Sequence, residues 1–160
     1  MVYNFEVIDY PTQDEIYQIN NIFYQSFNKI LNNYNHDKIA FIKDKNRIVA
    51  FNFINFKKLN TIIPNNHLFI YNLAVDPNER NKGLCQKLIK NLNKKYGNKY
   101  TMYLNVNTDK RKPNLAAIRC YKKGGFQFVD LPAENINGYY HNIMIRYKNK
   151  NKNKKTKNKK

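Results

Sequence analysis

Apolar and polar residues follow two different periods along this chain, and each period predicts a type of element. Apolar side chains three and four residues apart, such as Ile16, Ile19 and Phe23, predict amphipathic helices. Short runs rich in β-branched and aromatic residues predict strands instead. The helices are expected at about 13–31, 81–96 and 114–123, and the strands at 5–10, 38–43, 47–56, 67–75, 101–107, 126–130 and 141–147.

Turn residues and helices connect these strands in two ways. Asp44-Lys45-Asn46 joins two strands as a hairpin, whereas the helices at 81–96 and 114–123 cross over between strands. Because hairpins and crossovers alternate in the order β-α-β-β-β-α-β-α-β-β, the sheet must contain strands of mixed direction. The sequence therefore predicts an α/β domain over residues 1–147, with a central mixed β-sheet of about seven strands flanked by helices.

The charge of the chain is strongly positive, and part of it lies in a separate C-terminal segment. The chain has 29 basic and 11 acidic residues, which give a formal net charge of +18. Eight of the lysines lie in residues 148–160, KNKNKNKKTKNKK, a segment without apolar residues that is expected to be disordered. Such a tail can contact RNA, ribosomes or acidic proteins, or it can be solvated without a specific partner.

Other features of the composition argue against several protein classes. With 42% hydrophobic residues the chain can bury a core, so wholesale disorder is not expected. Cys85 and Cys120 do not make a disulfide framework, and no Cys/His cluster predicts a metal site. The N-terminus does not resemble a signal peptide, and no apolar run approaches the roughly 20 residues that span a membrane. A soluble cytoplasmic protein, monomeric or homodimeric and without a membrane partner, is therefore expected.

One stretch, Arg80-Asn81-Lys82-Gly83-Leu84-Cys85, places cations and a glycine between a buried strand and a helix. The first N–H groups of a helix lack intrahelical partners, and the helix dipole adds roughly half a positive charge there. A glycine lets a ligand approach the backbone without a Cβ in the way. The stretch therefore predicts a phosphate-binding site, although the GxxxxGK[ST] and GxGxxG patterns are both absent.

The same stretch resembles [QR]-x-x-G-x-[GA], a signature of the GNAT acetyltransferases. Downstream, Asn114, Ala117, Tyr121 and Gly125-Phe126 match N-x-x-A-x-x-x-Y-x-x-x-G-F, the helix and strand that follow in that family. The resemblance covers residues 67–130 by motif and the rest of the chain by topology. It implies a GNAT-like fold and the transfer of an acetyl group from acetyl-CoA to an amine.

The resemblance also implies a coenzyme site. Backbone N–H groups of residues 80–85 would bind the pyrophosphate, and the strand before them would splay from its neighbour and pair with the pantetheine arm. Asn114 would bind the pantetheine or the acetyl end, or cap its helix, and the two roles can coexist. Cys85 departs from [GA], and it is expected to pack as a small apolar residue rather than act as a reactive thiol. The implied coenzyme-binding residues are Leu73, Ala74, Val75, Arg80, Asn81, Lys82, Gly83, Leu84, Cys85, Asn114, Ala117 and Tyr121.

The chemistry implied by the resemblance has an acid but lacks an evident base. Tyr121 occupies the position of the family's general acid, which protonates the departing thiolate, although it can instead be a core residue of its helix. Where many relatives carry a Glu or His base, this chain has Asn105, which cannot take a proton at neutral pH. His141, beside Tyr139, could act through a water, whereas His67 is expected to be exposed at the start of its strand. Asn105, Tyr139 and His141 are the expected acceptor-site residues.

A site without a strong base favours an acceptor amine that is neutral by itself. At pH 7.5 an α-amine with a pKa of about 7.8 is roughly one third neutral, whereas a lysine at about 10.4 is only about 0.1% neutral. The segment NGYYHNIMIRY also resembles the loop and last strand of N-terminal peptide acetyltransferases. The sequence therefore favours acetyl transfer to a protein or peptide N-terminus. The alternatives are acetylation of a small-molecule amine or a protein lysine, a basic nucleic-acid-binding protein, and a non-catalytic acyl-CoA binder on the same fold.

Overall fold

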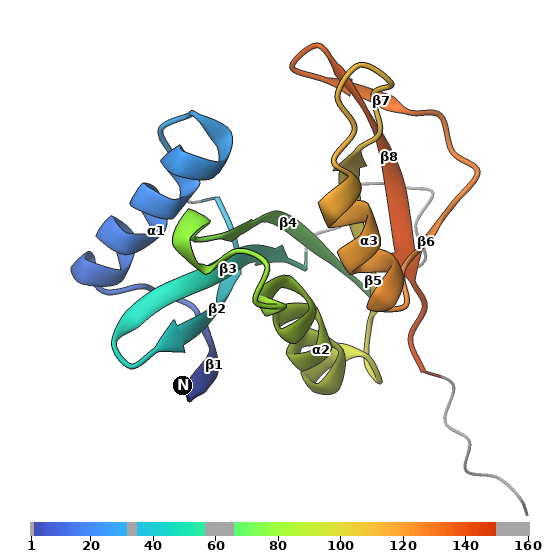
Figure 1. Ribbon diagram of the computed structural model, residues 1–160. Coiled ribbons are helices and arrows are strands. Elements are labelled where there is room, and N and C mark those ends of the chain that lie inside the picture. The colour runs from blue at the N-terminus through green and yellow to red at the C-terminus, as the bar shows by residue number, and fades with distance from the viewer. Residues whose placement is uncertain (1, 32–34, 57–65, 150–160) are drawn as a thin grey trace, which may run out of the picture.

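The computed structural model describes residues 2–31, 35–56 and 66–149 and places them in one β-sheet with three α-helices (Figure 1). The expected α/β class is confirmed. In chain order the elements are β1 (Tyr3–Ile8), α1 (Gln13–Phe27), β2 (Lys38–Asp44), β3 (Arg47–Asn55), β4 (His67–Val75), the 3-10 helix η1 (Pro77–Glu79), α2 (Leu84–Tyr96), β5 (Thr101–Asn107), α3 (Leu115–Lys123), β6 (Gln127–Phe128), β7 (Glu134–Ile136) and β8 (Tyr139–Arg146).

The sheet is mixed, as the sequence predicts. In the described part of the chain it has eight strands in the order β1-β2-β3-β4-β5-β8-β6, with β7 paired to β8. β4 and β5 run parallel because α2 carries the chain back between them, and the other neighbouring strands are antiparallel. The eighth strand is the short β7, which the sequence pattern did not predict.

The helices cover opposite faces of the sheet. Alternate residues of β2 show this, since Ile39 and Phe41 belong to the core beneath α1, whereas Ala40 and Ile42 belong to the core beneath α2. None of the helices in the described ranges is long and apolar enough to span a membrane. α2 buries the residues that its helical spacing predicts: Leu84, Leu88, Leu92 and Tyr96.

β4 and β5 separate soon after they meet. They pair only where residues 67–69 lie beside residues 101–103, and in Figure 1 β4 then runs away from β5 and β8 toward α1. β4 also carries a bulge against β3, because Asn72 adopts a left-handed backbone with φ 51° and the register shifts there. The predicted splay of this strand is therefore present, and it leaves one edge of residues 73–75 without a neighbouring strand.

Several boundaries differ from the prediction because asparagine takes left-handed backbone conformations. α1 ends at Phe27 rather than near residue 31, since Asn28 has φ 51°. α2 begins at Leu84 rather than at residue 81, since Asn81 has φ 64° and is followed by a left-handed Gly83. These residues cannot continue a right-handed helix, although the apolar spacing alone would allow it.

The C-terminal tail predicted for residues 148–160 lies mostly outside the described residues. Its first two residues are described, and both bind the end of the domain. The Lys148 N–H donates to Oγ1 of Thr101 at 3.4 Å, and the Asn149 N–H donates to the Gly97 carbonyl at 2.8 Å. The ordered part of the domain therefore extends at least to Asn149.

Close packing of α3 against α2 generates a stability prediction at Gly124. A Cβ at this position would clash with Cγ2 of Ile89 and lie 3.2 Å from the carbonyl oxygen of Tyr121. The backbone, with φ −79° and ψ 1°, suits any L residue, so the contact and not the conformation sets the cost. Gly124→Ala should lower the free energy of unfolding by about 1–3 kcal/mol in urea denaturation.

An Ile89→Ala background provides the matched control. It removes the methyl group that the new Cβ would meet, so Gly124→Ala should cost less free energy there than in the wild type. An equal cost in both backgrounds would mean that the contact with Ile89 does not limit the approach of the two helices.

Candidate active site

A cavity of about 590 Å³ lies where β4, the start of α2 and α3 meet. We call it the α2–α3 cavity. All the residues that the sequence predicts for the coenzyme, with the exception of Lys82, line it. Sequence reasoning missed further lining residues from all three α-helices and from η1. They are Ser26 and Phe27 from the end of α1, Glu79 from η1, Gln86 from α2, and Ala116, Arg119, Cys120 and Lys123 from α3. Arg119 and Lys123 were detectable as a basic pair one helical turn apart.

The start of α2 faces this cavity with unsatisfied backbone donors. Gly83 is the N-cap residue with φ 74°, and no side chain caps the helix. The first intrahelical bond runs from the Lys87 N–H to the Gly83 carbonyl at 3.0 Å, which leaves the N–H groups of residues 84–86 without intrahelical acceptors. A Cβ at Gly83 would have nothing within 4 Å, so the glycine keeps this end open to a ligand. An anion fits here.

Most of the basic side chains beside the start of α2 make ion pairs or hydrogen bonds that stabilise the loop between β4 and α2. Glu79 is buried, and its carboxylate binds Nζ of Lys82 at 2.7 Å and Nη2 of Arg47 at 2.5 Å. Hydrogen bonds from Lys82 and Arg47 lower the pKa of Glu79 below its usual value. Arg80 lies 3.4 Å from both the Val75 carbonyl and Ser26 Oγ. Lys82 therefore pairs with Glu79 instead of lining the cavity.

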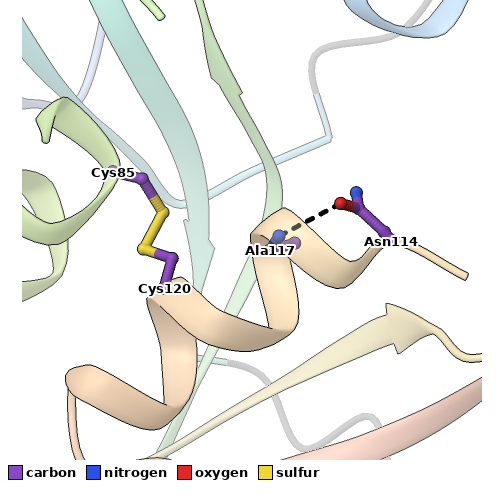
Figure 2. The surroundings of a disulfide bond; sticks show 4 residues. All are labelled: Cys85, Asn114, Ala117 and Cys120. Atoms are coloured by element: carbon purple, nitrogen blue, oxygen red, sulfur yellow. Dashed lines mark hydrogen bonds between the residues drawn. A yellow bond between two sulfur atoms is a disulfide. The ribbon is translucent and has the colours of Figure 1, made fainter. Parts of the chain in front are cut away.

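Asn114 at the start of α3 and Tyr121 in its last turn have different roles at the cavity. Asn114 is the N-cap residue, and its Oδ1 accepts from the Ala117 N–H at 3.1 Å (Figure 2). The capping role is thus observed. Asn114 also lines the cavity, and its contact with a ligand stays a prediction. Tyr121 is buried beside Phe126, and burial raises the pKa of its phenol to about 12. The hydroxyl therefore keeps its proton throughout the neutral range.

The two cysteines form a disulfide bond with each other, a pairing that the sequence did not predict. Figure 2 shows Cys85, in the first turn of α2, joined to Cys120 on α3. Neither residue is a free thiol, and Cys85 does not simply pack beneath the loop. The pairing depends on how the two helices meet, which a separation of 35 residues in the sequence does not reveal.

The predicted acceptor residues share one face of the sheet at the splayed strands. Asn105 of β5 pairs with Ile143 of β8, and Asn107 pairs with His141, so Asn105 and His141 point to the same face two residues apart. Oδ1 of Asn105 is buried and has no hydrogen-bond donor among the described residues. Nδ1 of His141 lies 3.0 Å from the Tyr139 carbonyl, which can only accept, so Nδ1 carries the hydrogen and Nε2 is left as the acceptor.

The hairpin of β7 and β8 is held to the loop after β5 by one carboxylate. Asp109 is buried and binds Arg111, whose Nη2 also donates to the Gly138 carbonyl at 2.5 Å. The Tyr140 N–H donates to Oδ2 of Asp109 at 3.2 Å. These hydrogen bonds, with Arg111 contributing most, lower the pKa of Asp109 far below its usual value. The guanidinium of Arg111 also lies 5.2 Å from the ring centre of Tyr139.

A second cavity, of about 610 Å³, lies between this hairpin and the loop after β5. We call it the hairpin cavity. The charged residues that line it are Asp109, Lys110 and Arg111. Sequence reasoning missed this arrangement, although Asn137-Gly138, with φ 52° and 81°, is a strong hairpin signal between short strands.

His67 is not exposed, contrary to the prediction. It is 4% exposed, and its ring lies 5.3 Å from that of Tyr103. His67 sits where β4 and β5 still pair, at the far end of the strand from the α2–α3 cavity. Among the described residues, no three His, Cys, Asp or Glu side chains gather in a way that could hold a metal ion.

Solved structures show that this arrangement is a known fold. The structure superimposes on the ribosomal-protein-S18-alanine N-acetyltransferase from Escherichia coli with a TM-score of 0.66 and 16% identity, over 93% of this chain and 96% of that one. Arabidopsis thaliana NAA60 in complex with acetyl-CoA gives 0.71 and 17%, over 91% and 99%. An aminoglycoside 6'-N-acetyltransferase complexed with coenzyme A gives 0.71 and 13%, over 89% and 96%.

The sequence comparisons agree with the fold. A search of curated proteins finds no significant match to the chain. The model of the acetyltransferase (GNAT) family matches residues 2–126, which is more than half of the 160 residues. This chain therefore belongs to the GNAT acetyltransferase family.

Proposed function

We propose that this protein transfers the acetyl group of acetyl-CoA to the N-terminal α-amine of a protein or peptide. Acetyl-CoA is the co-substrate, and the residues of the α2–α3 cavity fit it. The free N–H groups at the start of α2 suit a pyrophosphate. The unpaired edge of residues 73–75 suits the amide groups of a pantetheine arm, which can bind as an added strand does. Arg119 and Lys123 add positive charge to the same cavity.

The single observation that carries the acceptor assignment is Asn105. It lies at the splay on the face that His141 shares, and it offers a buried acceptor atom that has no hydrogen-bond partner in the described part of the chain. A buried, unsatisfied carbonyl oxygen costs about 1–3 kcal/mol, which an amine N–H would recover. Asn105 can thus orient the amine but cannot remove its proton, so the acceptor has to be an amine that loses its proton easily.

Tyr121 and His141 are the residues that can donate and accept protons in the proposed reaction. Tyr121 lines the cavity and holds its proton at neutral pH, so it can donate to the departing thiolate. Nε2 of His141 can accept a proton through a water, since Nδ1 is committed to the Tyr139 carbonyl. Glu134 lies directly opposite His141 in the β7–β8 register.

The preference for an α-amine follows from its ionisation. With pKa values of about 7.8 and 10.4, the neutral fraction at pH 7.5 is a few hundred-fold larger for an α-amine than for a lysine. This ratio corresponds to about 3 kcal/mol that an enzyme without a strong base would otherwise have to supply.

The hairpin cavity, which is lined in part by the hairpin that carries His141, does not suit a polycationic small molecule. Its one carboxylate, Asp109, already binds Arg111, and Lys110 and Arg111 make the lining basic. A polycation would meet repulsion there. Four aromatic residues along the sheet give no support to nucleic-acid binding, since Phe53, Tyr71, Phe69 and Tyr103 pack on one another and are buried or half-buried.

Gly83→Val tests the coenzyme site. The new side chain would stand over the free N–H groups of α2, and a β-branched residue resists a φ of 74°. Because each hydrogen bond to a charged acceptor contributes about 1.5–3 kcal/mol, acetyl-CoA binding should weaken on the order of tenfold or more. Isothermal titration calorimetry measures it.

Gly138→Val is the matched control. Gly138 also has a left-handed backbone, with φ 81° and nothing within 4 Å of an added Cβ, but it lies in the β7–β8 turn. Acetyl-CoA affinity should stay near the wild-type value in this variant. Unchanged affinity in a folded Gly83→Val protein, or an equal loss in both variants, would contradict the assignment.

Tyr121→Phe tests the acid. It removes only the hydroxyl, so kcat should fall by about ten- to a thousandfold while acetyl-CoA affinity changes little. Because burial raises the pKa of Tyr121 to about 12, its ionisation should leave no limb in the pH–rate profile at neutral pH. Tyr96→Phe is the control, because it changes a different buried tyrosine, which lies on α2, and its kcat should stay at the wild-type value. A wild-type kcat in Tyr121→Phe would make this residue part of the core only.

A short peptide with a free N-terminus and one lysine tests the acceptor. The α-amine should be acetylated first at pH 7, and kcat/KM should rise with pH toward the amine's pKa and level off above it. Mass spectrometry locates the modified site. Asn105→Glu should shift the midpoint of the profile to lower pH, because a carboxylate at this position can accept the proton. Preferential lysine acetylation at pH 7 would refute the proposal and make His141 the first base to test.

A further inference from the structure

The Cys85–Cys120 disulfide joins the two helices between which the coenzyme is expected to bind. Both cysteines line the α2–α3 cavity. Cys85 is the second residue of α2, so it carries one of the free N–H groups of the anion site. Cys120 immediately precedes Tyr121 on α3. Figure 2 shows the bond crossing from one helix to the other. One covalent bond thus connects the anion site with the helix that carries the proposed acid.

The contacts that Gly124 makes with α2 lie at the far end of α3. There Nδ2 of Asn93 donates to the Gly124 carbonyl at 3.0 Å, and Gly124 packs against Ile89. The first turn of α3, from Leu115, is exposed and lies beside the cavity. The disulfide therefore joins the start of α2 to α3 one helical turn before the Gly124 contacts, on the side of the pair that lines the cavity.

We propose that Cys85–Cys120 is a reversible thiol–disulfide site that controls the affinity for acetyl-CoA, and that a dithiol reductant lowers this affinity. The inference rests on the proposed coenzyme site. The dithiol gives up two electrons and becomes a disulfide itself, the Sγ–Sγ bond of the protein breaks, and the two protons of the dithiol pass to the cysteine sulfurs. Oxidation by a small-molecule disulfide reverses each of these changes.

Two physical effects give the direction. First, the bond holds both walls of the cavity in place before the ligand arrives, and loss of such preorganisation weakens binding. Second, reduction leaves a cysteine thiol in the first turn of α2, where any thiolate that it formed would repel the pyrophosphate. Cys85 is half-buried and Cys120 is 6% exposed, so Cys85 is the sulfur that a reductant can reach.

The test compares acetyl-CoA affinity in the oxidised and reduced forms of the full chain. Acetyl-CoA is the probe because it has no free thiol, and a water-soluble phosphine is the reductant because it forms a phosphine oxide with oxygen from water and leaves no adduct. The reduced protein should bind more weakly, within the range of about 5- to 150-fold that is typical of coupled sites. Alkylation and mass spectrometry should find both thiols blocked before reduction and both alkylated after it.

A Cys85→Ser, Cys120→Ser double variant is the control, because it lacks the bond but keeps side chains of similar size. Its affinity should not respond to the phosphine, and circular dichroism should show that it and the reduced wild type are folded. Equal affinity of the oxidised and reduced wild type would overturn this inference and leave the proposed function standing. Free thiols that glutathione disulfide cannot oxidise would also overturn it. Failure of the oxidised protein to bind acetyl-CoA at all would overturn the proposed function as well.

Discussion

Backbone N–H and C=O groups that leave a β-ladder must find other partners, and this requirement acts on the edge of β4. β4 stays paired with β3 on one side, but beyond Phe69 its other side no longer pairs with β5. The bulge at Asn72 turns the strand at this point. A ligand with amide groups can complete the ladder as an extra strand does, and the same splay gives an acceptor amine a way to reach the acetyl group.

The charges of the site divide into those that build it and those that remain for a ligand. Glu79 binds Lys82 and Arg47, and Asp109 binds Arg111, so both buried carboxylates are neutralised by neighbours within the fold. The positive end of α2 remains, together with the basic face of α3. The fold thus uses its acids to fix two loops and keeps its positive potential for phosphate.

The sequence predicted well the parts that depend on periodicity and on local chemistry. The leucine stripe of α2, the strand β5 and the glycine at the helix start need only near neighbours in the chain, and all are found where the pattern placed them. The left-handed Asn28 and Asn81 were harder to foresee, because asparagine only tolerates this conformation and does not require it.

The parts that the sequence did not predict depend on contacts between distant segments. The Cys85–Cys120 bond and the burial of His67 each follow from how elements pack, so apolar spacing carries no signal for them. Asn137-Gly138 is different, since the hairpin signal was present in the sequence and was missed.

Hydrogen–deuterium exchange with and without saturating acetyl-CoA tests the central claim, that the start of α2 and the free edge of β4 hold the coenzyme. The amides of residues 84–86 and 73–75 lie at these two places. On binding, exchange should slow in peptides covering these two segments, whereas the paired strands β1 and β2 should exchange as before. Saturable binding with no slowing in either segment would contradict the account, because the coenzyme would then occupy another part of the molecule.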